Sequence, residues 1–167
     1  MLNIQQKIES IKLIVCDVDG TLTDGGIYLT EDGIEFKKFS AKDGLAMSRL
    51  NQNGLKVALL SHTKNIKLIQ RRAEMLGLSL WYAGKEPKLQ ILNQWLEKEQ
   101  FTHEEVCFIG DDLNDLDIME KAGLKVCPAN SCEEILTLCD IIIPRNGGQD
   151  CFRYFADMYF KNYLLTI

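Results

Sequence analysis

The chain has 167 residues, of which 46% are hydrophobic and 26% charged, and its formal net charge is −5. This composition is typical of a globular protein, its apolar runs are too short to span a membrane, and it lacks the basic stripe of a nucleic-acid-binding protein. Because its six cysteines form no CxxC pair and its N-terminus lacks the apolar stretch of a signal peptide, we expect one cytoplasmic domain, residues 1–167, without a nucleic-acid or membrane partner.

The first half of the chain alternates apolar runs with helical patterns. Residues 12–16 form a short apolar run that predicts a buried strand. Two alternating runs within 27–39 flank Glu31-Asp32-Gly33 and predict a β-hairpin. Helical spacing predicts a helix over 43–53, and a second buried strand follows at 56–60.

The second half continues the same alternation. Further strands are predicted at 79–83, 106–109, 124–127 and 141–143, and further helices at 65–76, from Pro87 onward, at 114–122 and at 149–164. Pro87 suits the first turn of its helix. Ser131 and Glu134 have the spacing of a capping box, which predicts one more short helix.

Strands that alternate with helices in this way predict an α/β fold. We expect a mostly parallel sheet with helices on both faces, and the hairpin as its one antiparallel insertion. In such sheets the ligand site lies beyond the carboxyl ends of the strands. Polar residues follow four of the predicted strands: Asp17 and Asp19, then Ser61, then Lys88, and finally Asp111, Asp112 and Asp115.

These side chains predict phosphate chemistry with a metal ion. Clustered carboxylates raise one another's pKa unless a cation lies among them, and Mg²⁺ suits oxygen ligands beside a phosphate. Asp17 is placed to attack phosphorus. Asp19, two residues on, faces the same side and can act as acid and base. Ser61 can bind a phosphoryl oxygen, and Lys88 can neutralise its charge.

Each feature taken alone has a simpler interpretation. Asp-Gly at a strand end is usually a turn, and Asp111-Asp112 with Asp115 has the pattern of a capped helix start. Lys88 alone would be a solvated surface residue. All four features fall at strand ends in one order, however, and this order favours a shared site.

The motifs Asp17-Val-Asp-Gly-Thr21 and Gly110-Asp-Asp-Leu-Asn-Asp115, with Ser61 and Lys88 between them, resemble the haloacid dehalogenase superfamily of phosphatases, which has a Rossmann-like fold. The resemblance implies that Asp17 is the nucleophile and Asp19 the acid and base. It also implies Mg²⁺ held by Asp17, by the backbone carbonyl of Asp19 and by Asp111. Asp112 and Asp115 would contact the ligands of the metal, or would reach the metal through a water molecule.

Many members of this superfamily carry a cap domain, but the connections here are too short for one. The stretches 17–25 and 35–44 and a late Gly147-Gly148 followed by Arg153 resemble the capless group that acts on 3-deoxy-manno-octulosonate 8-phosphate and on nine-carbon sugar-acid phosphates. That resemblance implies a homotetramer joined through its hairpins. Substrate contacts would come from Lys42, Asp43, Gly44 and Arg71, and from Arg153 of a neighbouring subunit.

Two stretches depart from the octulosonate pattern. Ser61-His62-Thr63 stands where Thr-Gly-Arg is usual, and 147–153 is bulkier and more acidic than the usual tail. The substrate therefore stays open between the octulosonate phosphate, a nine-carbon sugar-acid 9-phosphate and another small metabolite. It also stays open whether His62 contacts the substrate. A non-catalytic module is the remaining alternative, and the complete set of acidic residues with Lys88 argues against it.

Overall fold

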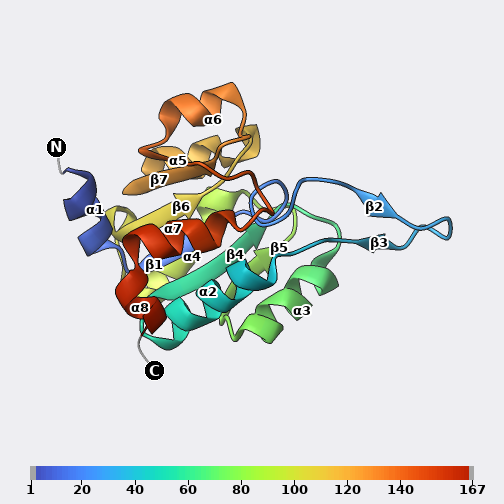
Figure 1. Ribbon diagram of the computed structural model, residues 1–167, viewed down its shortest axis with the longest axis horizontal. Coiled ribbons are helices and arrows are strands. Elements are labelled where there is room, and N and C mark those ends of the chain that lie inside the picture. Colours follow the sequence, from blue (N-terminus) through green and yellow to red (C-terminus); the bar gives the residue numbers. More distant parts are fainter. Residues whose placement is uncertain (1–2, 166–167) are drawn as a thin grey trace.

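The computed structural model describes residues 3–165 and is built around a six-stranded parallel sheet (Figure 1). The strands lie in the order β5-β4-β1-β6-β7-β8. Their bounds are β1 Leu13–Cys16, β4 Lys56–Ser61, β5 Leu80–Ala83, β6 Val106–Ile109, β7 Leu124–Pro128 and β8 Ile141–Ile143. This confirms the predicted α/β fold with a parallel sheet.

Strand β1 lies at the centre of the sheet and fixes where the strand ends meet. It pairs with β4 on one side and with β6 on the other, so that Cys16 lies opposite both Leu59 and Ile109. All four residues of β1 are buried, as expected for a strand covered on both faces. The segments that follow these three strands therefore emerge side by side at one edge.

Helices cover both faces of the sheet, as the sequence predicts (Figure 1). One face is covered by α1 Ile4–Ser10, α2 Ala41–Gln52, α3 Ile66–Leu76, α7 Cys151–Tyr159 and α8 Lys161–Leu165, and the other by α4 Lys88–Glu99, α5 Leu116–Lys121 and α6 Glu133–Leu138. Successive strand residues alternate between the faces. Thus Ile14 and Cys16 pack in the first layer, and Leu13 and Val15 in the second.

The predicted hairpin is a separate antiparallel sheet of two short strands, β2 Tyr28–Leu29 and β3 Glu35–Phe36. It projects away from the helices and the main sheet (Figure 1). Tyr28 stacks on Phe36 with 5.3 Å between ring centroids. The strands are shorter than predicted, because only these two residue pairs are in register.

Several predicted helices differ in the structure. The expected helix 149–164 is divided at Phe160 into α7 and α8, and that expected at 114–122 begins with the 3₁₀ turn η2 Leu113–Asp115. The prediction that Ser131 forms a capping box with Glu134 is wrong. The hydroxyl of Ser131 donates to the carbonyl of Pro128, and the helix begins only at Glu133.

Two elements were not predicted from the sequence, and both lie at the end of the sheet opposite the carboxyl ends of the strands. They are α1 and the 3₁₀ turn η1 His103–Glu105. Asn3 and Gln6 form a capping box for α1, and Thr102 and Glu105 form one for η1. Within residues 3–165, every helix is too short or too polar to cross a bilayer.

Candidate active site

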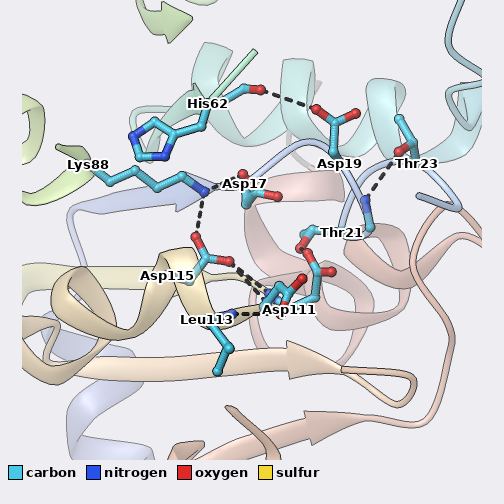
Figure 2. A network of polar contacts seen from close by, with 12 residues as sticks. Asp17, Asp19, Thr21, Thr23, His62, Lys88, Asp111, Leu113 and Asp115 are labelled. Carbon is cyan, nitrogen blue, oxygen red and sulfur yellow. Dashed lines mark hydrogen bonds and ion pairs between the residues drawn. The ribbon is translucent and has the colours of Figure 1, made fainter. Parts of the chain in front are cut away.

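Lys88 lies at the centre of the site and joins two of its loops. It is the first residue of α4 and follows Pro87, the N-cap. Its ammonium nitrogen lies 2.5 Å from Oδ1 of Asp17 and 2.6 Å from Oδ1 of Asp115 (Figure 2). All three residues are buried, so the ion pairs fix the carboxylate of Asp17 directly after β1.

Asp115 organises the loop that follows β6. Its second oxygen accepts the backbone N–H groups of Asp111 at 3.0 Å and of Asp112 at 3.4 Å. Asp112 in turn accepts the N–H of Leu113 and thereby caps η2. Thr21 of the loop after β1 donates its hydroxyl to Asp111 at 2.7 Å. The loop after β1 and the loop after β6 are therefore joined twice, through Lys88 and through the hydrogen bond from Thr21 to Asp111 (Figure 2).

Asp17, Asp111 and Asp115 offer carboxylate oxygens that all lie within 4.8 Å of one another. Burial raises the pKa of Asp17 well above its usual range, although Lys88 opposes this effect. Burial likewise raises the pKa of Asp111 to about 6, against the hydrogen bond from Thr21. Burial would lower the pKa of Lys88, but the charges of Asp17 and Asp115 outweigh it and raise that pKa.

This arrangement fits a divalent metal ion. When ionised, the three carboxylates together with the single ammonium group of Lys88 carry a net charge of −2. A hard ion with a charge of two balances this charge, and oxygen ligands beside a phosphate site suit Mg²⁺. Of the residues predicted to hold the ion, Asp17 and Asp111 lie in this group. Asp115, which was predicted to support the ligands or to bind through water, lies in this group too.

Two glycines allow the loops to approach so closely. Gly20 has a φ of +91°, and a Cβ there would lie 2.0 Å from Oδ2 of Asp111. A Cβ on Gly147 would lie 1.7 Å from the carbonyl oxygen of Gly20. The neighbouring Gly148 donates its N–H to the carbonyl of Thr21. The late Gly-Gly pair therefore supports the loop that carries Asp17 and Asp19.

Asp19 lies outside the group of three carboxylates. Its Oδ2 is 3.4 Å from the hydroxyl of Ser61, which donates to it from the end of β4. Its Oδ1 lies 2.5 Å from the ammonium nitrogen of Lys37, which follows β3. The strand ends predicted that Ser61 and Asp19 share one site, whereas the presence of Lys37 there was not predicted.

A cavity of about 280 Å³ opens beside these residues. Asp17, Asp19 and Asp111 line it, together with Gly20, Gly25, His62, Asp112 and Asn114. The Nε2 atom of His62 lies 2.7 Å from the carbonyl oxygen of Glu86, to which it donates. The cavity therefore combines Asp17, Asp19 and Asp111 with His62, one of the positions that departs from the octulosonate pattern. Of the predicted catalytic residues, Ser61 and Lys88 do not line it.

The five residues predicted to bind substrate lie elsewhere, and none lines this cavity. Asp43 is buried and accepts the backbone N–H of Arg153 at 2.8 Å. Lys42 pairs with Asp150, and the exposed Arg71 with Glu74. A Cβ on Gly44 would lie 2.6 Å from Nη2 of Arg72. Their contact with substrate stays a prediction.

Three residues of the site were not predicted: Thr21, Lys37 and Asn114. Thr21 and Asn114 lie inside the two acidic motifs, so their position was a usable signal. Lys37 is one of two adjacent lysines in the hairpin region, and nothing local in the sequence distinguishes it from Lys38.

Comparison with known proteins identifies the family of the chain. The family model of haloacid dehalogenase-like hydrolases matches residues 40–123. The chain is 34% identical to the 3-deoxy-D-manno-octulosonate 8-phosphate phosphatase KdsC of Escherichia coli strain B over 93% of this chain and 82% of that protein.

Solved structures give the same result. A probable phosphatase of the YrbI family from Pseudomonas syringae has a TM-score of 0.89 and 35% identity, covering 95% of this chain and 90% of its own. The 3-deoxy-D-manno-octulosonate 8-phosphate phosphatase of Moraxella catarrhalis, in complex with magnesium, phosphate and KDO, has a TM-score of 0.88 and 34% identity, with the same coverage. The chain belongs to the family of haloacid dehalogenase-like hydrolases.

Proposed function

We propose that this protein is a Mg²⁺-dependent phosphatase that hydrolyses 3-deoxy-D-manno-octulosonate 8-phosphate through an aspartyl-phosphate on Asp17. The observation that carries the proposal is the buried carboxylate of Asp17, held by Lys88 at the wall of a cavity that Asp19 and Asp111 also line. The named activities of the Escherichia coli and Moraxella catarrhalis relatives support the substrate.

In the first step the carboxylate of Asp17 attacks phosphorus and the ester P–O bond breaks. Asp19 gives its proton to the leaving oxygen. Lys88 keeps Asp17 aligned. The hydroxyl of Ser61, which donates to Asp19 in the structure, would bind a phosphoryl oxygen. These groups are held before the substrate arrives, so their alignment lowers the barrier rather than costing binding free energy.

In the second step water attacks the phosphorus of the aspartyl-phosphate, and Asp19 accepts the proton of that water. Phosphate leaves and the carboxylate of Asp17 is restored. Asp17 and Asp111, with the backbone carbonyl of Asp19, would hold Mg²⁺, and Asp115 and Asp112 would support them. When bound, the ion supplies positive charge beside the transferring phosphoryl group.

The second candidate substrate is a nine-carbon sugar-acid 9-phosphate or another small phosphate ester. His62 favours this candidate, because it lines the cavity in the stretch where the octulosonate group carries Thr-Gly-Arg. An arginine in that stretch would offer a bidentate partner to a substrate carboxylate. Thr63 cannot do so, and we therefore expect weaker discrimination between carboxylate-bearing substrates.

Steady-state kinetics test the function and the substrate together. We expect the Mg²⁺-loaded protein to hydrolyse p-nitrophenyl phosphate and the octulosonate phosphate, and excess chelator to stop both reactions. The ratio of kcat/KM values for the two sugar-acid phosphates decides between the candidates. Full turnover in chelator would contradict the metal-dependent mechanism, and a strict preference for the octulosonate phosphate would contradict weak discrimination.

We further propose that the protein acts without a cap domain, as a cytoplasmic homotetramer joined through β2 and β3. Four apolar side chains of the hairpin are exposed: Ile27, Leu29, Ile34 and Phe36. A two-stranded hairpin is marginally stable alone, and its free edges favour pairing with other strands. Four copies that join their hairpins in a closed ring would cover these edges and side chains.

A further inference from the structure

Lys37 is a half-buried residue whose cationic side chain reaches the site from outside the main sheet. Its side chain is only 8% exposed, although it follows a hairpin that projects from the molecule. Its ammonium nitrogen lies 2.5 Å from Oδ1 of Asp19 and 3.1 Å from Oε1 of Glu35. The lysine therefore joins the base of the hairpin to the loop that carries Asp17 and Asp19.

The strand geometry explains why Lys37 and not its neighbour makes this contact. Side chains alternate along an extended backbone, so Glu35 and Lys37 share one side and Lys38 faces the other. Lys38 is indeed exposed. The chain thus provides two adjacent lysines of equal charge, of which one contacts Asp19 and the other does not.

The contacts of Asp19 divide its two oxygens. Oδ1 is occupied by Lys37, and Oδ2 lies 3.4 Å from the hydroxyl of Ser61. With 41% of its side chain exposed, Asp19 is far more accessible than the buried Asp17 and Asp115, so packing supports it less. A partly exposed carboxylate needs fixed partners if it is to meet a leaving oxygen at one defined position.

We propose that Lys37 is a positioning residue that aligns Asp19 for proton transfer to the leaving oxygen and from the attacking water; this inference rests on the proposed phosphatase function. As the ester P–O bond breaks, the O–H bond of Asp19 breaks too, and its proton moves to the leaving oxygen. The negative charge then left on Asp19 lies beside the Lys37 ammonium group. The cation therefore stabilises the product of the proton transfer as well as the orientation of the donor.

The test compares two phosphate esters that differ in their need for an acid. The alkoxide that leaves an alkyl phosphate requires a proton, whereas p-nitrophenolate leaves without one. For Lys37→Met in the Mg²⁺-loaded protein we expect kcat/KM on the octulosonate phosphate to fall by about 10-fold or more, which is part of the roughly 10²–10⁴-fold that acid–base catalysis contributes. On p-nitrophenyl phosphate we expect a change of less than about 2-fold.

Two further variants complete the experiment. Lys38→Met removes the same charge from the adjacent residue and is expected to leave both kcat/KM values unchanged. Lys37→Arg keeps a cation at the same place and is expected to restore most of the loss on the alkyl ester. Activity on p-nitrophenyl phosphate also reports that each variant is folded.

The outcomes separate this inference from the function on which it rests. A wild-type protein that hydrolyses neither ester would overturn the proposed function and the inference with it. An active wild-type protein whose Lys37→Met variant loses equally on both esters would overturn the inference alone, because such a loss indicates a general structural role. A Lys38→Met variant with the same selective loss would also overturn it.

Discussion

In the proposed mechanism Asp17 alone forms the bond to phosphorus, so the charge of no neighbouring carboxylate can replace its own. Asp17→Asn keeps the shape of the side chain and leaves Lys88 its pair with Asp115. We therefore expect a folded protein that loses several orders of magnitude in turnover, as removal of a nucleophile does. Hydrolysis of p-nitrophenyl phosphate, with circular dichroism as the check on folding, measures this.

Asp117→Asn is the matched control for this prediction. Asp117 is exposed in the first turn of α5, close in sequence to Asp115 but outside the cavity lining. Its variant should keep wild-type turnover. If Asp17→Asn were also to turn over near the wild-type rate, the covalent mechanism would be wrong.

Gly20 tests whether the close packing of the two loops is needed for metal binding. In Gly20→Ala the new Cβ would lie 2.0 Å from Oδ2 of Asp111, so this carboxylate must move. We expect the variant to need about 10-fold more Mg²⁺ for half-maximal activity, because disturbing the contacts that orient a metal ligand, as Asp111 is proposed to be, costs affinity on the order of 10–100-fold. Titration of activity with Mg²⁺ gives the value.

Gly33→Ala provides a control with the same backbone strain. Gly33 has a φ of +80°, but its Cβ would meet no atom within 4 Å. Both variants carry the cost of a positive φ, and only Gly20→Ala has the clash. Equal Mg²⁺ requirements in the two variants would show that backbone strain, and not the contact with Asp111, explains the effect.

Residues of the site could be predicted wherever a motif and a strand end coincided. Asp17, Ser61 and Asp111 were found because strand register brings their positions together. Lys37 was missed because its contact with Asp19 spans 18 residues and depends on how the hairpin folds back. A local pattern carries no information about which of two lysines turns inward.

At the scale of elements, α2 and α7 exchange contacts at their N-termini. Asp43 in the first turn of α2 accepts the N–H of Arg153 in the first turn of α7. In return, Asp150 before α7 accepts hydrogen bonds from Ser40 and Lys42 at the start of α2. The second oxygen of Asp43 is buried and has no hydrogen-bond partner among residues 3–165.

This exchange predicts a pH-dependent stability. Burial raises the pKa of Asp43 to about 6, with Asp150 adding to the rise and Arg153, Arg72 and Lys42 opposing it. A carboxyl group whose pKa is higher in the folded than in the unfolded state makes its full contribution to stability when the pH lies below its unfolded pKa. That contribution is lost as the pH rises through 6. Ionised Asp43 therefore costs stability at neutral pH.

We therefore expect Asp43→Asn to gain stability relative to wild type as the pH rises from 4 to 8, by up to about 3 kcal/mol for the roughly two pKa units involved. Urea unfolding at several pH values measures this difference. Asp150→Asn is the opposing control, because hydrogen bonds from Ser40 and Lys42 lower the pKa of Asp150. Its loss of stability should be greatest at neutral pH and vanish in acid. A constant difference for Asp43→Asn would contradict the buried charge.

Helices and strands were predictable where their hydrophobic periodicity agreed with residues that favour the end of an element. Their exact ends were less predictable. Helix α3 ends at Gly77 with a φ of +70°, as expected of a glycine after a helix. The division between α7 and α8 at Phe160 has no such signal, because this residue is apolar and packs in the core. Tertiary packing decided that boundary, and local propensity could not reveal it.

For the whole molecule, the exposed hairpin predicts the assembly. Ile27 is 79% exposed and Leu29 62%, and a charge at either position would lie in the proposed contact between subunits. We expect light scattering to give the mass of four 19.0 kDa chains for the wild type, and a smaller mass for Leu29→Glu. Met75→Glu on α3, at a side chain 67% exposed, should keep the full mass. A monomeric wild-type protein with full activity would refute the assembly.

Subunit mixing tests the finer proposal that Arg153 serves the site of a neighbour. In its own chain Arg153 pairs with Asp157 at 2.8 Å and does not line the cavity, so a direct action on substrate requires a second copy. Asp17→Asn subunits would lack the nucleophile but still offer Arg153, and Arg153→Ala subunits would lack the arginine but keep Asp17. Co-expression of the two weak variants should therefore restore part of the activity, because some sites would then combine both residues.

The control is co-expression of Asp17→Asn with Asp19→Asn, both of which disable the site of their own chain and should give no recovery. An Arg153→Ala variant that is fully active alone, or mixed assemblies without recovery, would confine Arg153 to the packing of α7 on its own chain.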